Sequence, residues 1–306
     1  MKVYALMAFG LLMSSPATAG DMSSSEATFN EYYGKVRRID GADATSAARE
    51  AAKLFDASYL GFLGNQGLEK SPPEALHFFI RATAARHFYT HDARDVSAMH
   101  AAVGALASAG QDTQSDWDTY FRSLILARDF DQAALVQMRF KDWLPALPSI
   151  VLTQERTSAE KALWDVDVTS KSLVRQSVDV SRGMRLVVIS HPACRFSRAA
   201  MIAFESDPEL RVLPVLWVVP PERDLNFDLV GSWNSDHPTV PVRLVDRTSQ
   251  WNFKHWSTPT FYVLKDGEVV GQGTGWAIDG RSRADVVDLI SQARSADHGT
   301  AGEPGQ

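Results

Sequence analysis

Cysteine is nearly absent from this chain, because only Cys194 among its 306 residues is a cysteine. A single cysteine excludes any internal disulfide framework. Long hydrophobic runs are also missing, since no apolar stretch approaches the roughly 20 residues that span a bilayer. Basic residues form no cluster and the formal net charge is −6, which argues against nucleic acid or an anionic membrane as a partner.

Phosphate-binding glycine patterns are missing as well. The sequence has neither a Walker A pattern nor a Rossmann glycine fingerprint. The glycine-rich stretch at 271–275 follows a predicted hairpin strand and opens no helix, so it is interpreted as a strand end and a loop. We therefore expect no cofactor.

The first residues have the pattern of a cleavable secretory signal. Lys2 provides a positive start, Val3 to Met13 form a short apolar core, and Ala17-Thr18-Ala19 is an A-x-A cleavage site before Gly20. The apolar core is too short to cross a membrane. We expect a periplasmic protein without a membrane span, and a free thiol in that oxidising compartment requires an explanation.

The chain divides into a helical part and a part that alternates strands with helices. Helical spacing of apolar residues continues to about Leu147, where Pro145 and Pro148 end the pattern. Short β-branched runs follow and predict strands. We expect a signal peptide over 1–19, a helical domain over 20–148, a linker over 149–161, an α/β domain over 162–296 and a disordered tail over 297–306.

One turn in the helical part resembles that of a tetratricopeptide unit. Residues 127–134 place an aromatic side chain and small residues where two helices would pack closely. A repeating period of about 34 residues does not occur. The expected N-terminal fold is therefore an all-α array of helical hairpins with one tetratricopeptide-like unit.

Cys194 stands between a predicted strand and a predicted helix. Met184 to Ser190 reads as a buried strand, and Arg198 to Glu205 has helical periodicity. A cysteine at the start of a helix lies at the positive end of the helix dipole, which lowers its pKa and favours the thiolate. The residue three positions on is Ser197, so this C-x-x-S site can attack a sulfur but cannot close a disulfide on itself.

A second pattern lies nearer the C-terminus. Thr258-Pro259-Thr260 precedes an apolar run, and Asp266-Gly267 between two such runs predicts a β-hairpin. Proline is tolerated at the start of a strand. Between the two patterns, Val212 to Val219 predicts a buried strand that would lie parallel to the strand before Cys194.

Taken in order, the elements resemble a thioredoxin-fold domain. The resemblance extends from about Ala162 to Arg294 and rests on strand, Ser190 to Ser197, helix, strand, Thr258-Pro259-Thr260, hairpin and last helix. It implies an α/β thioredoxin-like domain after the helical domain.

The resemblance also implies roles for three residues. Cys194 corresponds to the cysteine that attacks client disulfides, and Pro259 to the cis proline that lies against it. The family's resolving cysteine corresponds to Ser197, so the site departs from the family there. Full thioredoxin-type turnover is not expected of such a degenerate site.

Several neighbouring side chains have two interpretations. Ser197 either donates a hydrogen bond to the Cys194 sulfur or is a passive substitute for a lost cysteine. Thr258, His191 and Arg195 are candidates for binding the substrate. His191 either acts as an acid or base beside the thiol or caps the strand exit, and Arg195 either stabilises a thiolate or carboxylate or is a solvated arginine.

Two further residue groups have alternative interpretations. An insertion over about Pro220 to Trp256 contains tryptophans that either line a substrate groove or, as the usual burial of aromatic side chains favours, fill a core: Trp233, Trp251 and Trp256.

His87 and His91 have the i,i+4 spacing that two metal ligands can share, with His100 further along. No H-E-x-x-H pattern accompanies them, so we expect no metal site.

Two functions fit these features. The first is a monothiol thiol–disulfide oxidoreductase whose Cys194 attacks a protein or peptide client, with a resolving thiol from another molecule. The alternative is a non-catalytic thioredoxin-like module that binds a peptide or protein partner near Pro259. A third, remote function is that of the monothiol glutaredoxins, whose C-G-F-S motif binds glutathione and an iron–sulfur cluster. Residues 194–197 differ from this motif at one position, and Arg195 in place of the glycine would crowd the close approach that the cluster requires.

Overall fold

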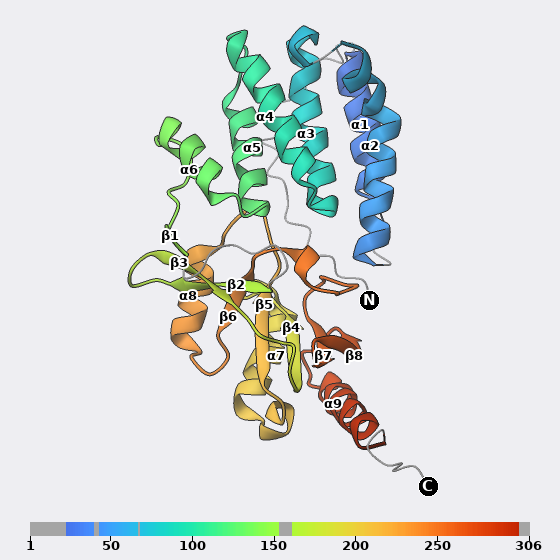
Figure 1. Cartoon of the computed structure of the whole chain (residues 1–306), viewed down its shortest axis with the longest axis vertical. Helices are drawn as coiled ribbons and strands as arrows, with labels where there is room; N and C mark the ends of the chain where they lie inside the picture. Colours follow the sequence, from blue (N-terminus) through green and yellow to red (C-terminus); the bar gives the residue numbers. More distant parts are fainter. Residues whose placement is uncertain (1–22, 40–42, 67, 153–160, 300–306) are drawn as a thin grey trace.

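The chain forms a layer of helices at one end and a sheet flanked by helices at the other (Figure 1). The computed structural model describes residues 23–39, 43–66, 68–152 and 161–299. The predicted signal peptide lies outside the described residues, as does the chain after Gly299. We call the described residues up to 148 the helical domain and those from 149 the sheet domain.

The helical domain contains six described α-helices, several of which begin with a side-chain cap. Thr113 and Asp116 form a reciprocal capping box at the start of α5, and Asp92 caps α4 through the N–H of Arg94. The six helices are α1 (Ser24–Val36), α2 (Ala44–Gln66), α3 (Pro73–Thr90), α4 (Ala93–Ser108), α5 (Gln114–Leu126) and α6 (Phe130–Arg139).

Arg128 joins the two domains from the tight turn between α5 and α6. Its φ is 56°, and the next residue, Asp129, caps α6 by accepting from the N–H of Gln132. The Arg128 side chain is 1 % exposed, and its Nε donates to the carbonyl oxygen of Val245 in the sheet domain at 3.1 Å. The turn that resembles a tetratricopeptide unit is therefore part of the contact between the domains.

The sheet domain is built on one mixed eight-stranded sheet in the order β1-β3-β2-β6-β5-β4-β7-β8. Its strands are β1 (Ser149–Leu152), β2 (Ala162–Asp167), β3 (Ser172–Ser177), β4 (Met184–Ile189), β5 (Val215–Val219), β6 (Val242–Val245), β7 (Thr260–Lys265) and β8 (Glu268–Thr274). Its α-helices are α7 (Arg195–Ser206), α8 (Phe227–Asp236) and α9 (Ser282–Gly299).

The central part of this sheet has the strand pairing that the sequence patterns predict. Strand β4 pairs parallel with β5 across α7 and antiparallel with β7, and β7 and β8 form the predicted hairpin before α9. Asp266 and Gly267 have φ values of 49° and 88°, as a hairpin turn with two positive φ angles requires. The predicted succession of helical region and α/β domain is therefore present.

Several boundaries differ from the sequence-based expectation. Residues 149–152, assigned to the linker, form β1 and pair parallel with β3. Four residues are too few to show a period, so backbone pairing decides this strand. The strand expected from Val212 begins at Val215, after a 3₁₀ turn over Pro208–Arg211. Helix α9 continues to Gly299, past the expected start of the tail.

The expected insertion supplies part of the sheet itself. Its strand β6 pairs parallel with β5 and antiparallel with β2, which joins the β1-β3-β2 ribbon to the central strands. Trp233 is 7 % exposed and donates from Nε1 to the carbonyl oxygen of Val240, and Trp251 is 4 % exposed. Trp256 is half-buried beside the same core as Trp251. The core interpretation of these tryptophans matches their burial.

The two faces of the sheet bury different partners, because successive strand residues point to opposite sides. One face packs against α7, α8 and α9 in a core that includes Phe204, Val230 and Ile290. The other face packs against the segment before the Thr258-Pro259 bond: the Phe253 ring stacks on Tyr262 at 4.1 Å. None of the helices in the described ranges has the length and apolarity to traverse a bilayer.

Candidate functional site

Cys194 occupies the N-cap position of α7, directly after the loop that follows β4. Its backbone is extended, with φ −81° and ψ 116°, and its side chain makes no capping hydrogen bond. The residue is half-buried. The helix begins at Arg195, three residues earlier than its apolar periodicity indicates, so the thiol lies at the amino end of the helix as predicted.

His191 folds the loop that carries the cysteine. Its Nδ1 accepts from the N–H of Ala193 at 3.0 Å, and its carbonyl oxygen accepts from the N–H of Cys194 at 2.9 Å. The His191 residue is 4 % exposed. These two bonds match the interpretation in which His191 caps the strand exit. They favour it over acid–base chemistry at Nδ1, because this nitrogen already accepts from the backbone.

Thr258 and Pro259 lie across from the thiol. The Thr258–Pro259 peptide bond is cis, and Pro259 is buried. The Cys194 Sγ donates to the carbonyl oxygen of Thr258 at 3.6 Å. Strand pairing produces this approach, because Ile189 at the end of β4 is the partner of Thr260 at the start of β7.

The segment before Thr258 is held in place by β7. The Tyr262 hydroxyl donates to the carbonyl oxygen of His255 at 2.9 Å and accepts from the N–H of the same residue at 2.8 Å. The Thr260 hydroxyl donates to the carbonyl oxygen of Ser257 at 2.7 Å. These bonds fix the backbone just before Thr258, the residue that faces the sulfur.

The pKa of the Cys194 thiol is lowered from its ordinary value. Burial alone raises this pKa, and the Thr258 carbonyl oxygen favours the protonated thiol. The backbone N–H of Ser197, the side chains of Thr258 and Ser197, and the N–H of Phe196 act in the opposite direction and prevail. The first turn of α7 therefore stabilises the thiolate, the form that attacks sulfur.

Ser197 is fully buried one helical turn beyond the thiol. Within the described residues its Oγ has no hydrogen-bond partner of ordinary geometry, yet its hydroxyl is close enough to the sulfur to lower the thiol pKa. This favours the interpretation in which Ser197 assists the thiolate. The side chain also occupies the position from which a second cysteine would close a disulfide.

Arg195 lies at the helix start but is turned toward its neighbour. The residue is exposed, and its guanidinium carbon lies 4.6 Å from the centre of the Phe196 ring. This geometry matches the solvated alternative better than a direct contact with the thiolate. A role for Arg195 in binding a substrate stays a prediction.

Two residues of the site were not singled out from the sequence. Glu222 Oε2 lies 3.3 Å from His191 Nε2 and accepts from Asn226 Nδ2 at 2.9 Å. Both residues belong to the loop after β5. Because β4 and β5 are parallel neighbours, the loops at their carboxyl ends meet. Glu222 follows Pro220-Pro221 directly after the predicted strand, so its position in the sequence could have identified it as a neighbour of the thiol loop.

The histidine pair of the helical domain lies in a different setting. His87 is fully buried, and burial lowers its pKa to about 4, with the nearby His91 and Arg223 acting in the same direction. The rings of His87 and His91 are 6.2 Å apart, and His100 Nδ1 lies 3.0 Å from the Tyr120 hydroxyl. The described part of the chain contains no cluster of three or more metal-ligating side chains.

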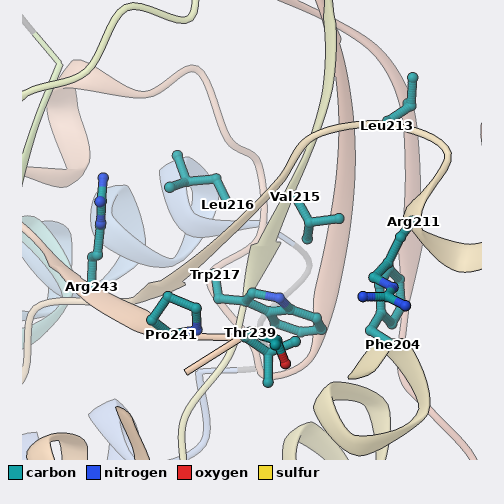
Figure 2. A pocket seen from close by; sticks show the side chains of 10 residues that line it. Phe204, Arg211, Leu213, Val215, Leu216, Trp217, Thr239, Pro241 and Arg243 are labelled. Carbon is teal, nitrogen blue, oxygen red and sulfur yellow. The ribbon is translucent and has the colours of Figure 1, made fainter. Parts of the chain in front are cut away.

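A cavity of about 340 Å³ opens at the other edge of the sheet (Figure 2). It lies at the amino ends of β5 and β6, whereas Cys194 follows the carboxyl end of β4. The guanidinium groups of Arg211 and Arg243 lie on opposite sides of it. Arg243 already pairs with Asp165 at 2.8 Å. This cavity is separate from the thiol site.

Comparisons with known proteins add little to this description. No protein-family model matches the chain, and no curated protein matches it. A solved structure named "Solution Structure of a Putative Thioredoxin from Neisseria meningitidis" is similar at 19 % identity and a TM-score of 0.33, covering 49 % of this chain and 100 % of that chain. A likeness at this TM-score carries no argument about this chain.

Proposed function

We propose that this protein is an exported, periplasmic monothiol thiol–disulfide oxidoreductase that acts through Cys194. The observation that supports this most directly is a half-buried thiol with a lowered pKa, at the start of α7 and opposite Thr258. Ser197 occupies the position of a resolving cysteine. Residues 1–19 are the signal peptide in this proposal, and an intact Met1 in the mass of the exported protein would contradict it.

The reaction requires thiols from outside the chain. The Cys194 thiolate attacks one sulfur of a client disulfide, an S–S bond forms between them, and the client's other sulfur leaves as a thiolate. A first external thiol attacks the Cys194 sulfur and releases the client as a dithiol. A second external thiol then forms a disulfide with the first and releases the Cys194 thiolate. The client gains two electrons and two protons, and the two external thiols become one disulfide.

The helical domain recruits the client in this proposal. Its α5–α6 pair, with the tetratricopeptide-like turn at Arg128, contacts the sheet domain beside the carboxyl end of β6. A client held by the helical domain would therefore lie at the edge of the sheet from which Cys194 is reached.

The rate of iodoacetamide alkylation as a function of pH tests the proposal. A midpoint below about 8.5, together with client adducts that reductant releases, supports it. Ser197→Cys should then convert intermolecular adducts into an internal disulfide with Cys194, detected as the loss of both free thiols after mild oxidation. An ordinary midpoint with no adducts contradicts the proposal and favours the non-catalytic binding module.

A further inference from the structure

The loop after β5, residues 220–226, contacts both the helical domain and the loop that carries the thiol. Arg223 Nη2 donates to the carbonyl oxygen of Ala84 on α3, and Asp224 pairs with Arg122 on α5. Glu222, between these contacts and the sheet, faces His191. One short segment therefore links the helical layer to the thiol site.

Glu222 has a cationic neighbour from the helical domain as well. Burial lowers the pKa of Arg128 to about 10, while the charges of Asp246 and Glu222 act in the opposite direction. Arg128 reaches the sheet domain from the α5–α6 turn. Both the partners of Arg223 and Asp224 and the positive charge near Glu222 are thus supplied by the helical domain.

The hydrogen bonds of His191 determine its tautomer. Its Nδ1 accepts from the Ala193 N–H, so this nitrogen carries no proton. The proton of the neutral ring is then on Nε2, which lies 3.3 Å from Glu222 Oε2 and 3.5 Å from Asn226 Nδ2. Asn226 Nδ2 donates to the same oxygen at 2.9 Å, which holds the carboxylate in place. A carboxylate that orients a histidine in this way sets which ring nitrogen accepts.

We propose that Glu222 is a positioning residue for Cys194: it fixes His191 in the Nε2–H tautomer, so that His191 can hold the backbone of the thiol loop. This inference rests on the proposed thiol chemistry. The His191 ring accepts from the N–H of Ala193, and the His191 carbonyl oxygen accepts from the N–H of Cys194; these are the two residues just before α7. Their placement sets where the sulfur lies relative to the N–H groups of the first helical turn.

The effect of the Glu222 charge alone has the opposite sign, which makes the proposal testable. Removing a negative charge near a thiol lowers the thiol pKa, because the thiolate is repelled less. Releasing the loop raises the pKa, because the sulfur loses the aligned N–H groups of Phe196 and Ser197. Glu222→Ala removes both the charge and the acceptor, whereas Glu222→Gln removes the charge and keeps an acceptor for His191.

The experiment measures the iodoacetamide rate against pH for Glu222→Ala, Glu222→Gln and the control Glu268→Ala, an exposed residue on β8. We expect Glu222→Ala to raise the midpoint and to lower the rate at neutral pH about three- to tenfold, since one pKa unit changes the thiolate fraction about tenfold. Glu222→Gln, which loses only the charge, should leave the midpoint unchanged or lower it, and Glu268→Ala should stay close to wild type. A lower midpoint in both Glu222 variants, or an unchanged profile in Glu222→Ala, would overturn the positioning role.

The ¹⁵N spectrum of the His191 ring is a second readout that does not need thiol reactivity. In the wild-type protein it should show an unprotonated Nδ1 and a protonated Nε2 at neutral pH, and Glu222→Gln should preserve this pattern. A protonated Nδ1 in the wild type would contradict the inference even if Glu222→Ala failed to fold. An unreactive wild-type thiol with the expected tautomer would instead contradict the proposed function and leave the His191 geometry intact.

Discussion

The Cys194 sulfur lies 3.6 Å from the carbonyl oxygen of Thr258, the residue whose peptide bond to Pro259 is cis. The two residues are far apart in sequence and meet because β4 and β7 are antiparallel neighbours. The sulfur is therefore placed between a carbonyl oxygen that favours the thiol and a helix start that favours the thiolate.

Replacing the thiol with a hydroxyl should abolish reactivity without loss of stability. Cys194 is the N-cap residue of α7 and makes no capping hydrogen bond, whereas serine is among the preferred N-cap residues. Cys194→Ser should lose all alkylation and client adducts, and its free energy of unfolding should equal that of wild type or exceed it by up to about 1 kcal/mol. Urea unfolding compared with Cys194→Ala checks this; a clear loss of stability in Cys194→Ser would contradict the N-cap assignment.

Ser197→Ala should weaken the thiolate while leaving the fold intact. The hydroxyl is fully buried, lacks an ordinary hydrogen-bond partner among the described residues, and contributes to lowering the Cys194 pKa. Its removal should raise the alkylation midpoint, while the free energy of unfolding changes by less than about 1 kcal/mol. The pH–rate profile together with thermal unfolding measures both quantities. An unchanged profile would show that Ser197 is only a passive substitute for cysteine.

The helical domain should lose stability in mild acid because of His87. Its folded-state pKa of about 4 lies below the unfolded value near 6.5, so the unfolded chain binds more protons between these values. Stability should therefore fall as the pH drops from about 6.5 toward 4, by up to about 3 kcal/mol from this group. His87→Leu should make the pH dependence of urea unfolding shallower. An equally steep dependence in the variant would assign the acid sensitivity to other groups.

Asp246→Ala should strongly destabilise the sheet domain. Asp246 accepts from Trp164 Nε1 at 2.9 Å and from Arg175 Nε and Nη2 at 3.2 Å, and all three side chains are buried. Removing the Asp246 carboxylate takes a negative charge and two accepted hydrogen bonds away from a buried guanidinium, which costs about 3–5 kcal/mol. Chemical unfolding measures the loss. Replacing Arg175 with leucine in the same chain should recover part of it, and no recovery would contradict the charge-burial explanation.

Much of the architecture could be predicted from local sequence. Helical periodicity predicted the helices of the N-terminal part, Asp266-Gly267 predicted the hairpin, and the apolar runs predicted β4 and β7. These signals are local because a helix repeats every 3.6 residues and a tight turn requires particular φ angles. Cys194 and Thr258-Pro259 could be singled out for the same reason, since each directly adjoins such an element.

Long-range pairing decided the rest. Strand β1 has four residues and too little pattern to be recognised, and β6 joins the sheet only because β5 and β2 lie on either side of it. Glu222 became part of the site because parallel neighbours bring their carboxyl-end loops together. The residue types of the thiol site could thus be determined from the sequence alone. Which atoms face the sulfur and which nitrogen of His191 carries the proton depend on contacts between distant segments, and only the tertiary structure decides those.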